Sequence, residues 1–210
     1  MAACDRIRRW RILGFVNAES SFACDLPAAL IRRAQAGNHS AFEQIYRRFE
    51  RPVFTLALRM LADRFEAEEV LQDTMLRLFD RVHGFRGESP FWAWLRRIAV
   101  NEALMRLRRR GRIEYTDTAL ESETEDDDHR LPPAAADHAR LLRALHELPA
   151  LTRSVLWLYH AEGFTHEEIA SAMDRSVSFS KSQLARGTRR LRALLTEAAS
   201  PAALELSQHA

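Results

Sequence analysis

The chain of 210 residues contains only two cysteines, Cys4 and Cys24. Two thiols supply neither a disulfide framework nor a four-thiolate zinc site, so a disulfide-rich secreted fold and a cysteine zinc finger are excluded. The apolar run from Ile12 to Val16 is shorter than the ~7–15 residues of a signal-peptide core. No run approaches the ~18 apolar residues of a membrane span. We therefore expect a cytoplasmic protein without direct membrane insertion.

Signatures of catalysis are also missing. The stretch from His166 to Ala170 lacks the second histidine of a zinc-protease helix, and no Gly-rich phosphate loop or nucleophile elbow occurs. Adjacent carboxylates, as in Glu68-Glu69, diverge by roughly 100° on a helix and cannot flank one substrate. The eight histidines lack the spacing of metal ligands. The sequence thus predicts no enzymatic activity, no metal, no cofactor and no small-molecule substrate.

Charge is unevenly distributed along the chain. Residues 1–112 carry 21 basic and 13 acidic side chains, residues 113–137 carry 1 and 9, and residues 138–210 carry 9 and 7. The resulting net charges of +8, −8 and +2 give the overall value of +2. Two basic segments separated by an acidic, proline-containing stretch can address two parts of one polyanion, of which DNA is the commonest. We therefore expect a nucleic-acid-binding protein with two compact units.

Helix signals organise the first segment. Ser40 to Glu43 has the pattern of a capping box, and Pro52 is expected to kink or restart the helix that follows. Asp63 is a second predicted N-cap, and Gly84 marks the end of its helix. The predicted core face of this helix comprises Leu71, Met75, Leu78, Phe79 and Val82. The opposite face comprises Glu69, Gln72, Asp73 and Asp80. Such a face is either a docking surface or simply a solvated one.

A third helix is predicted to begin with Ser89 as N-cap and Pro90 at the first helical position. Aromatic residues open it and arginines follow: Phe91, Trp92, Trp94, Arg96, Arg97, Arg106, Arg108, Arg109 and Arg110. Arg97, Asn101 and Arg108 lie near one line of the helix and can follow a phosphate backbone together. The aromatic rings either stack on unpaired bases or pack in the core.

Residues 113–137 contain six carboxylates between Glu121 and Asp128 and are predicted to be a disordered linker. An alternative role for this acidic segment is to occupy a basic channel otherwise used by nucleic acid. From about Asp137 a second module of short helices is expected, with breaks at Pro149 and Gly163. A capping box from Thr165 to Glu168 opens a short helix, and a turn around Asp174 leads into a basic one. This pattern predicts a helix-turn-helix, although a solvated basic helix end would look similar.

The order of these segments resembles the sigma-70 family of RNA polymerase sigma factors, in its extracytoplasmic-function (ECF) group. The strings EAEEVLQDTMLRLFDRV and GFRGESPFWAWLRRIAVNEALMRLRRR precede the acidic stretch, and LHELPALTRSVLWLYHAEGFTHEEIASAM and SKSQLARGTRRLR follow it. The resemblance covers about residues 26–195. It implies an all-α protein with two small helical domains, a sigma region 2 bundle and a sigma region 4 helix-turn-helix, joined by an acidic flexible linker.

The resemblance also implies a division of the chain and a function. An N-terminal extension (1–25), expected to be disordered, would precede region 2 (26–112), the linker (113–137), region 4 (138–195) and a C-terminal tail (196–210). Such a protein binds core RNA polymerase, recognises the −10 and −35 promoter elements and opens the DNA. The alternative is a free-standing helix-turn-helix regulator, which needs only region 4.

Residue by residue, the resemblance predicts three contact surfaces. The clamp helices of the largest polymerase subunit would bind Glu69, Gln72 and Asp73. The −10 element would contact Phe85, Arg86, Trp92, Arg96, Arg97 and Asn101. The −35 element would contact Ser178, Lys181, Ser182, Gln183, Arg186, Arg189 and Arg190. Many family members are held inactive by an anti-sigma factor, which makes such an inhibitor a candidate partner.

The chain departs from the family pattern at a few positions. Met105 stands where an acidic residue is usual, and Met173-Asp174 replaces a Leu-Gly pair before the recognition helix. Phe179-Ser180 replaces a Thr-Val pair within it. We expect Val177 and Phe179 to supply the replacement core contacts.

Overall fold

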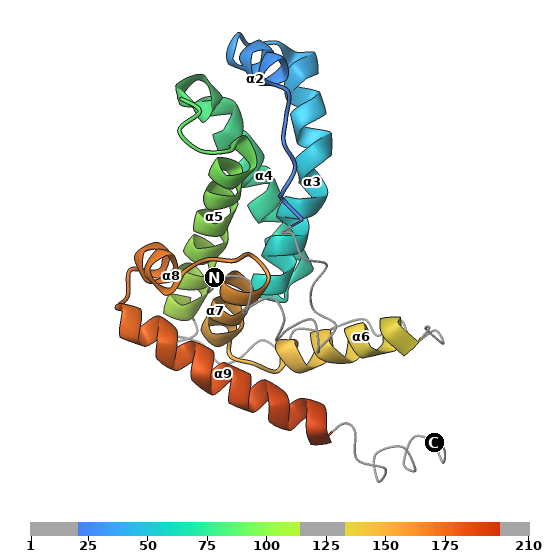
Figure 1. Ribbon diagram of the computed structural model, residues 1–210, viewed down its shortest axis with the longest axis vertical. Helices are drawn as coiled ribbons and strands as arrows, with labels where there is room; N and C mark the ends of the chain where they lie inside the picture. The colour runs from blue at the N-terminus through green and yellow to red at the C-terminus, as the bar shows by residue number, and fades with distance from the viewer. Residues whose placement is uncertain (1–20, 114–132, 198–210) are drawn as a thin grey trace, which may run out of the picture. The chain divides into compact units, whose positions relative to one another are not determined.

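The structure is a computed structural model that describes residues 21–113 and 133–197. Within these ranges the chain is helical, with turns and loops but no strand (Figure 1), which confirms the predicted all-α class. The described residues divide into two compact units, one on each side of the gap. Most of the predicted extension, linker and tail lies outside the described residues, namely in residues 1–20, 114–132 and 198–210.

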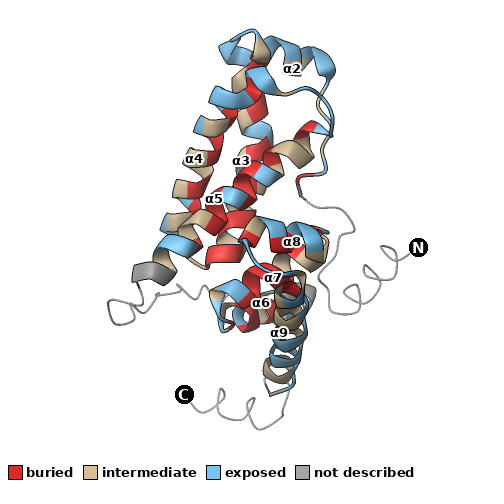
Figure 2. Ribbon diagram, turned by 90° about the vertical axis from the view of Figure 1, so that its left-hand side faces the viewer, coloured by how far each residue is buried: buried red, intermediate tan, exposed pale blue. Residues whose placement is uncertain are grey.

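The first unit is a helical bundle. It consists of α2 (Ala28–Gln35), α3 (His39–Leu61), α4 (Arg64–Arg81), a short 3-10 turn η1 (Val82–Gly84) and α5 (Phe91–Ile113). The buried faces of α3, α4 and α5 turn toward one another (Figure 2). Ile45, Leu78 and Leu95 are fully buried there, one from each helix. The 3.6-residue periodicity of the sequence therefore produces three apolar stripes that meet in one core.

The first two helix starts differ in how well the sequence predicts them. Asn38, not Ser40, caps α3, because its side chain accepts a hydrogen bond from Ala41 N at 2.9 Å. The predicted capping box at Ser40 is therefore wrong. Asp63 does cap α4, with Oδ1 accepting from Glu66 N at 3.0 Å. Both caps satisfy backbone N–H groups that have no partner inside the helix.

The predicted restart of the helix at Pro52 is wrong, because α3 runs unbroken from His39 to Leu61 with Pro52 inside it. The alternative, a kink at Pro52, stays a prediction. Phe49, Val53 and Leu56, which surround the proline in sequence, are buried. Packing of this apolar face stabilises the helix on both sides of the proline and outweighs the loss of one backbone hydrogen bond.

The segment before α2 belongs to the bundle rather than to a free extension. Phe22 is fully buried, and its ring stacks on that of Phe49 with centroids 6.3 Å apart. Burial of a phenylalanine contributes about 1.5–3 kcal/mol, which anchors the chain ahead of α2. The described part of the predicted disordered extension, residues 21–25, is therefore attached to the core through Phe22.

The second unit contains α6 (Pro133–His146), α7 (Ala150–His160), α8 (His166–Met173) and α9 (Val177–Glu197). A core cluster formed by α6, α7 and α9 includes Leu141, Leu145, Leu156 and Leu191. The helix α6 begins at Pro133, so the last residues of the predicted linker are helical. At the other end, α9 continues to Glu197, slightly past the predicted end of region 4.

Within the part of the chain that the structure describes, none of the helices is both long enough and apolar enough to cross a membrane.

Candidate nucleic-acid interface

The predicted docking face of α4 is engaged by an arginine from α5. Arg106 Nη1 donates to Glu66 at 3.0 Å, and its Nη2 donates to Glu69 at 3.2 Å and to Asp73 at 2.9 Å. Partial burial acts to lower the pKa of Arg106, but hydrogen bonds to Asp73, Glu66 and Glu69 outweigh it and raise the pKa further above its ordinary value. The three carboxylates are thus held in fixed positions and share one positive charge.

Apolar side chains interrupt the acidic face of α4. Phe65 is 69% exposed and Leu76 is 65% exposed, and both lie on the same side of the helix as Gln72, which is exposed as well. The predicted core residue Phe79 is also 44% exposed, with its ring against Phe42 at a centroid distance of 5.1 Å. The prediction that Phe79 is a core residue is therefore wrong, because nearly half of the residue is exposed. The face of α4 therefore combines exposed apolar side chains with carboxylates.

The loop between η1 and α5 rests on an aromatic cluster. The ring centroid of Phe85 lies 5.2 Å from that of Phe91 and 5.2 Å from that of Trp94. Phe91 is buried, whereas Phe85 and Trp94 are half-buried. Arg86 follows on the exposed side of the loop, and Gly87 adopts φ +76°, a left-handed conformation that favours glycine. The cluster and the glycine together fix the loop at the start of α5.

The outer surface of α5 presents the remaining predicted −10 residues. Arg96 lies over the Trp92 ring at 5.0 Å, a cation–π contact that holds both side chains. Arg97 and Asn101 are exposed one turn apart. Of the two alternatives for the tryptophans, packing fits Trp94, which joins the aromatic cluster. Trp92 pairs with an arginine, and its stacking on unpaired bases stays a prediction.

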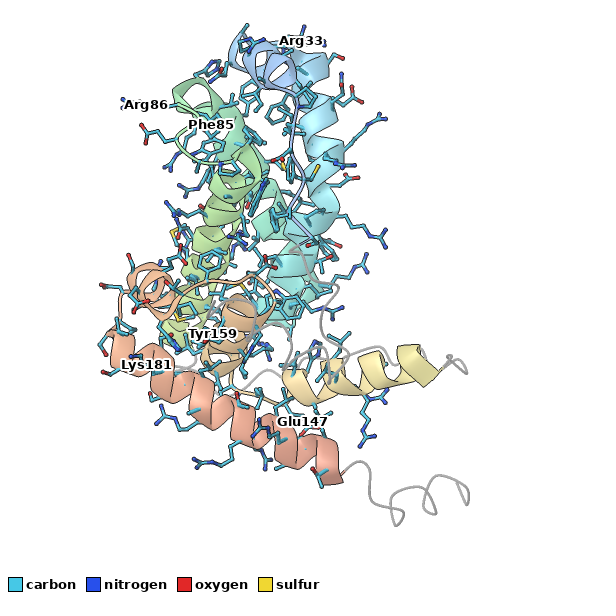
Figure 3. All side chains as sticks on the ribbon, viewed as in Figure 1. Arg33, Phe85, Arg86, Glu147, Tyr159 and Lys181 are labelled. Carbon is cyan, nitrogen blue, oxygen red and sulfur yellow. The ribbon has the colours of Figure 1, made fainter. Side chains whose placement is uncertain are left out.

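A pocket of about 410 Å³ opens beside this loop. Residues of the loop and the start of α5 form one side, including Phe85, Arg86 and Pro90. The other side comes from α2 and the residues before it, including Asp25 and Arg32. Figure 3 shows Phe85 and Arg86 on the loop near the end of the bundle where α2 and its Arg33 lie. The α2 side of this pocket was not predicted from the sequence.

In the second unit, α8 and α9 form a helix-turn-helix. Thr165 and Glu168 make the predicted capping box, in which each side chain bonds the other's backbone N–H, at 3.1 and 2.8 Å. Asp174 adopts φ +54° in the turn and takes over the role of the glycine that the family pattern has there. An aspartate tolerates this left-handed conformation better than most residues.

The changed residues at the start of α9 are accommodated by the neighbouring helix. Ser180 is fully buried, with its hydroxyl 3.0 Å from Nδ1 of His166 on α8. Val177 and Phe179 are only half-buried, and Arg175 lies over the Phe179 ring at 5.9 Å. The expected replacement core contacts from Val177 and Phe179 are therefore partial, and Ser180 occupies the buried position instead.

Most of the predicted −35 residues lie on the exposed surface of α9: Ser178, Lys181, Arg186, Arg189 and Arg190. Ser182 and Gln183 are half-buried. Gln183 Oε1 accepts a hydrogen bond from Thr152 on α7 at 2.7 Å, which draws this side chain toward the core of the unit. Glu167 on α8 has a lowered pKa, caused first by its backbone hydrogen bond and also by Thr165 and Lys181. The surface is accordingly basic with one acidic neighbour.

Sequence comparisons match both units to one family. The family description "Sigma-70 region 2" matches residues 45–113, and "Sigma-70, region 4" matches residues 138–191. The RNA polymerase sigma-H factor of Pseudomonas aeruginosa is 30% identical over 168 residues, which cover 75% of this chain and 87% of that protein. The ECF RNA polymerase sigma-E factor of Haemophilus influenzae is 30% identical over 169 residues, covering 75% and 89%.

Solved structures give the same result. The sigma factor RpoE in complex with the anti-sigma factor NepR from Bartonella quintana has a TM-score of 0.57 and 25% identity, and the match covers 74% of this chain and 96% of that one. CnrH in complex with the cytosolic domain of CnrY has a TM-score of 0.50 and 26% identity, covering 82% and 97%. The matches span both units, whereas a free-standing regulator needs only the second one. Membership of this family also agrees with the prediction that the chain is not an enzyme. The chain is therefore a sigma-70 family protein of the extracytoplasmic-function group.

Proposed function

We propose that this ECF sigma factor docks on core RNA polymerase through the exposed face of α4 and reads promoter DNA with the loop, α5 and α9. One observation in the first unit carries the proposal: α4 presents carboxylates, whereas the neighbouring α5 presents aromatic and basic side chains. The clamp helices of the largest polymerase subunit are the proposed partner of Glu69, Gln72 and Asp73. The site of action would be the cytoplasm.

The exposed apolar residues extend the proposed docking face. Leu76 lies one turn beyond Gln72 and Asp73, and its 65% exposure would be lost against a partner helix. Three carboxylates surround the single positive charge of Arg106, which leaves a net charge of about −2 on this cluster. This remaining negative charge would attract a cationic partner. The apolar contacts would then supply much of the affinity, and the charges would orient the partner.

Opening of the −10 element would rely on capture of unpaired bases. Phe85 would stack on an unstacked base, and Trp92 would do so with the ring face that Arg96 leaves uncovered. Arg86 and Arg97 are exposed for contact with the phosphates between these bases. No covalent bond in the DNA is broken, so the free energy that offsets unpairing and unstacking would come from these contacts with the single strand. We propose that the pocket beside Phe85 holds one extruded base.

Recognition of the −35 element would use α9 in the major groove. Ser178, Lys181 and Arg186 lie on its exposed face near the turn, which is where a recognition helix meets base edges. Arg189 and Arg190 lie farther along and would contact phosphates. With Gln183 bonded to Thr152, its amide nitrogen rather than its oxygen is the group left to face DNA.

An inhibitor is the last proposed partner. A neighbour of known structure is a sigma factor in complex with an anti-sigma factor, and another is a complex with a cytosolic domain. We include an anti-sigma factor among the partners of this chain on that likeness. The free-standing regulator would leave the face of α4 and the pocket of the first unit without a role.

Gln72→Arg provides the test of docking. Gln72 is exposed and makes no contact with Arg106, so a cation at this position should oppose the proposed partner without disturbing the bundle. Gln44→Arg on α3 is the matched control, because Gln44 is an exposed glutamine outside the proposed face. We expect binding of the full chain to purified core polymerase to weaken at least tenfold in Gln72→Arg and not in Gln44→Arg.

DNA opening is tested with the reconstituted holoenzyme. Permanganate reactivity of thymines in the −10 region should require both the chain and core polymerase. Tight, sequence-specific duplex binding by the isolated chain that core polymerase leaves unchanged would support the regulator instead. Equal binding of wild type and Gln72→Arg to core polymerase would refute the α4 docking face.

A further inference from the structure

The pocket beside the loop between η1 and α5 has a wall that lies outside the region 2 match, which begins at residue 45. This wall is formed by α2 and the residues that lead into it, among them Asp25, Leu26 and Arg32. Phe22 anchors the same segment in the core against Phe49. The wall is therefore part of the folded bundle, and its position relative to the loop is set by packing.

Gln35, the last residue of α2, joins the two sides of the pocket. Its Nε2 donates to the carbonyl of Phe85 at 2.8 Å and to the carbonyl of Val82 at 3.2 Å. Nδ1 of His83 lies 2.5 Å from the carbonyl oxygen of Gln35. These contacts connect α2 to η1 and to the first residue of the loop, so that the loop cannot move away without breaking them.

The lining of the pocket suits a nucleobase. Its size falls within the about 300–1,000 Å³ of pockets that bind small organic molecules. Leu26, Ile31 and Phe91 give it apolar surface, against which a flat ring can pack. Arg32 and Asp25 are exposed at the α2 side, with Arg86 opposite. A guanidinium donates to base carbonyl and ring nitrogen acceptors, and a carboxylate accepts from exocyclic amino groups.

We propose that α2 and the residues before it form half of the −10 base pocket, with Arg32 and Asp25 as specificity-determining residues and Gln35 as the positioning residue for the loop. This inference rests on the proposed function, because it assigns a base from the opened −10 element to the pocket. It adds to that function a second recognition element, contributed from outside the loop and α5.

The test compares two neighbouring arginines of α2. Arg32 lines the pocket, whereas Arg33 does not and instead donates from Nη2 to Asn38 Oδ1 at 3.3 Å. Arg32→Ala and Arg33→Ala therefore remove the same charge from the same helix. Each variant is assembled with core polymerase and challenged with a promoter library randomised through the −10 element, and the open complexes formed are sequenced.

Wild-type holoenzyme should prefer one base at the position that enters the pocket. Arg32→Ala should reduce that preference by about 5- to 150-fold, the loss expected when one good base contact is removed. Preferences at the other positions and the level of −35 binding should stay as in wild type. Arg33→Ala should leave all base preferences unchanged, with at most a uniform loss of binding. Unchanged preference in Arg32→Ala, or equal flattening by both variants, would overturn the proposal.

Gln35→Glu tests the positioning role. The substitution keeps the size of the side chain but removes the amide donor to both carbonyls. We expect the preference to fall at the same position as in Arg32→Ala, while thermal unfolding of the chain and duplex binding to the −35 element remain near wild type. A uniform loss at every position together with a lower melting temperature would show a merely structural role and overturn this part.

Failure of the inference and failure of the proposed function give different results. A wild-type holoenzyme that forms no open complex on any member of the library would refute the function. A holoenzyme that opens promoters with full preference in all three variants would leave the function intact and refute the role of α2.

Discussion

Loss of the Arg106 side chain should destabilise the first unit. Its guanidinium contacts Glu66, Glu69 and Asp73 at 2.9–3.2 Å, and the side chain is only 17% exposed. The carboxylates are 32–40% exposed, so each contact is more shielded from water than a surface ion pair, which contributes about 0.2–1 kcal/mol. Three such contacts sum to about 0.6–3 kcal/mol. Arg106→Gln also leaves three like charges close together on α4.

Thermal unfolding of the full chain, followed by circular dichroism, measures this loss. For a unit of this size, the midpoint should fall by roughly 4–8 °C per kcal/mol. Hydrogen exchange of peptides from α4 and α5 should increase, whereas exchange in α6 to α9 should not change. Arg106→Lys should recover part of the loss, because an ammonium keeps the charge but lacks the fork that reaches several carboxylates at once.

Arg64→Gln is the matched control for this prediction. Arg64 also pairs with a carboxylate, Glu68, at 3.0 Å, but the two side chains are 80% and 48% exposed. We expect a change of at most about 0.5 kcal/mol, as for other exposed pairs one helical turn apart. If Arg106→Gln were as stable as Arg64→Gln, the three contacts would not hold α4 to α5 and the reasoning would be refuted.

Four further substitutions test the packing, the backbone and an ion pair of the two units. Gly187→Ala should lower the urea midpoint of the second unit, because the new Cβ would lie 2.5 Å from a methyl group of the buried Leu156. Overpacking of this kind costs about 1–3 kcal/mol, whereas the gain in helix propensity is about 1 kcal/mol. Asp174→Gly should instead stabilise this unit by about 1 kcal/mol by relieving the left-handed backbone, and a lower melting temperature would contradict this. Arg77→Ala should destabilise the first unit more than Glu102→Gln does, because it leaves the Glu102 carboxylate, which is 4% exposed, without the arginine that lies 2.5 Å away. The reverse order of stability in denaturant unfolding would argue against a charged, buried Glu102.

The helices and the helix-turn-helix could be predicted because their signals are local. The capping box at Thr165 and the N-cap at Asp63 depend on residues three positions apart, which the sequence shows directly. The start of α3 was missed because Asn38 and Ser40 are both good N-caps, and only the path of the chain decides between them. The restart at Pro52 was wrong because the cost of a proline is local, whereas the burial of Phe49 and Val53 that offsets this cost is tertiary.

The contacts that build the candidate site could not be predicted, because they join residues far apart in sequence. Arg106 reaches carboxylates 33 to 40 positions earlier, and in sequence it is one of several arginines near the end of α5. Gln35 bonds the carbonyl of a residue 50 positions later. Neither side chain stands in a motif, so the available signal was only the residue type. These pairs become visible when the helices are packed.

The same packing makes α5 a shared support for the proposed docking face and the proposed −10 surface. Arg106 fixes one part of this helix to the carboxylates of α4, and Arg97, nine residues earlier and about 14 Å along the axis, belongs to the proposed −10 surface. A helix transmits a displacement of one end to the other because its backbone is stiff. Charge reversal at Glu69 and Asp73 would therefore disturb both the docking face and the position of α5. A loss of promoter opening in that variant would not separate the two proposed functions, whereas Gln72→Arg removes none of the contacts of Arg106.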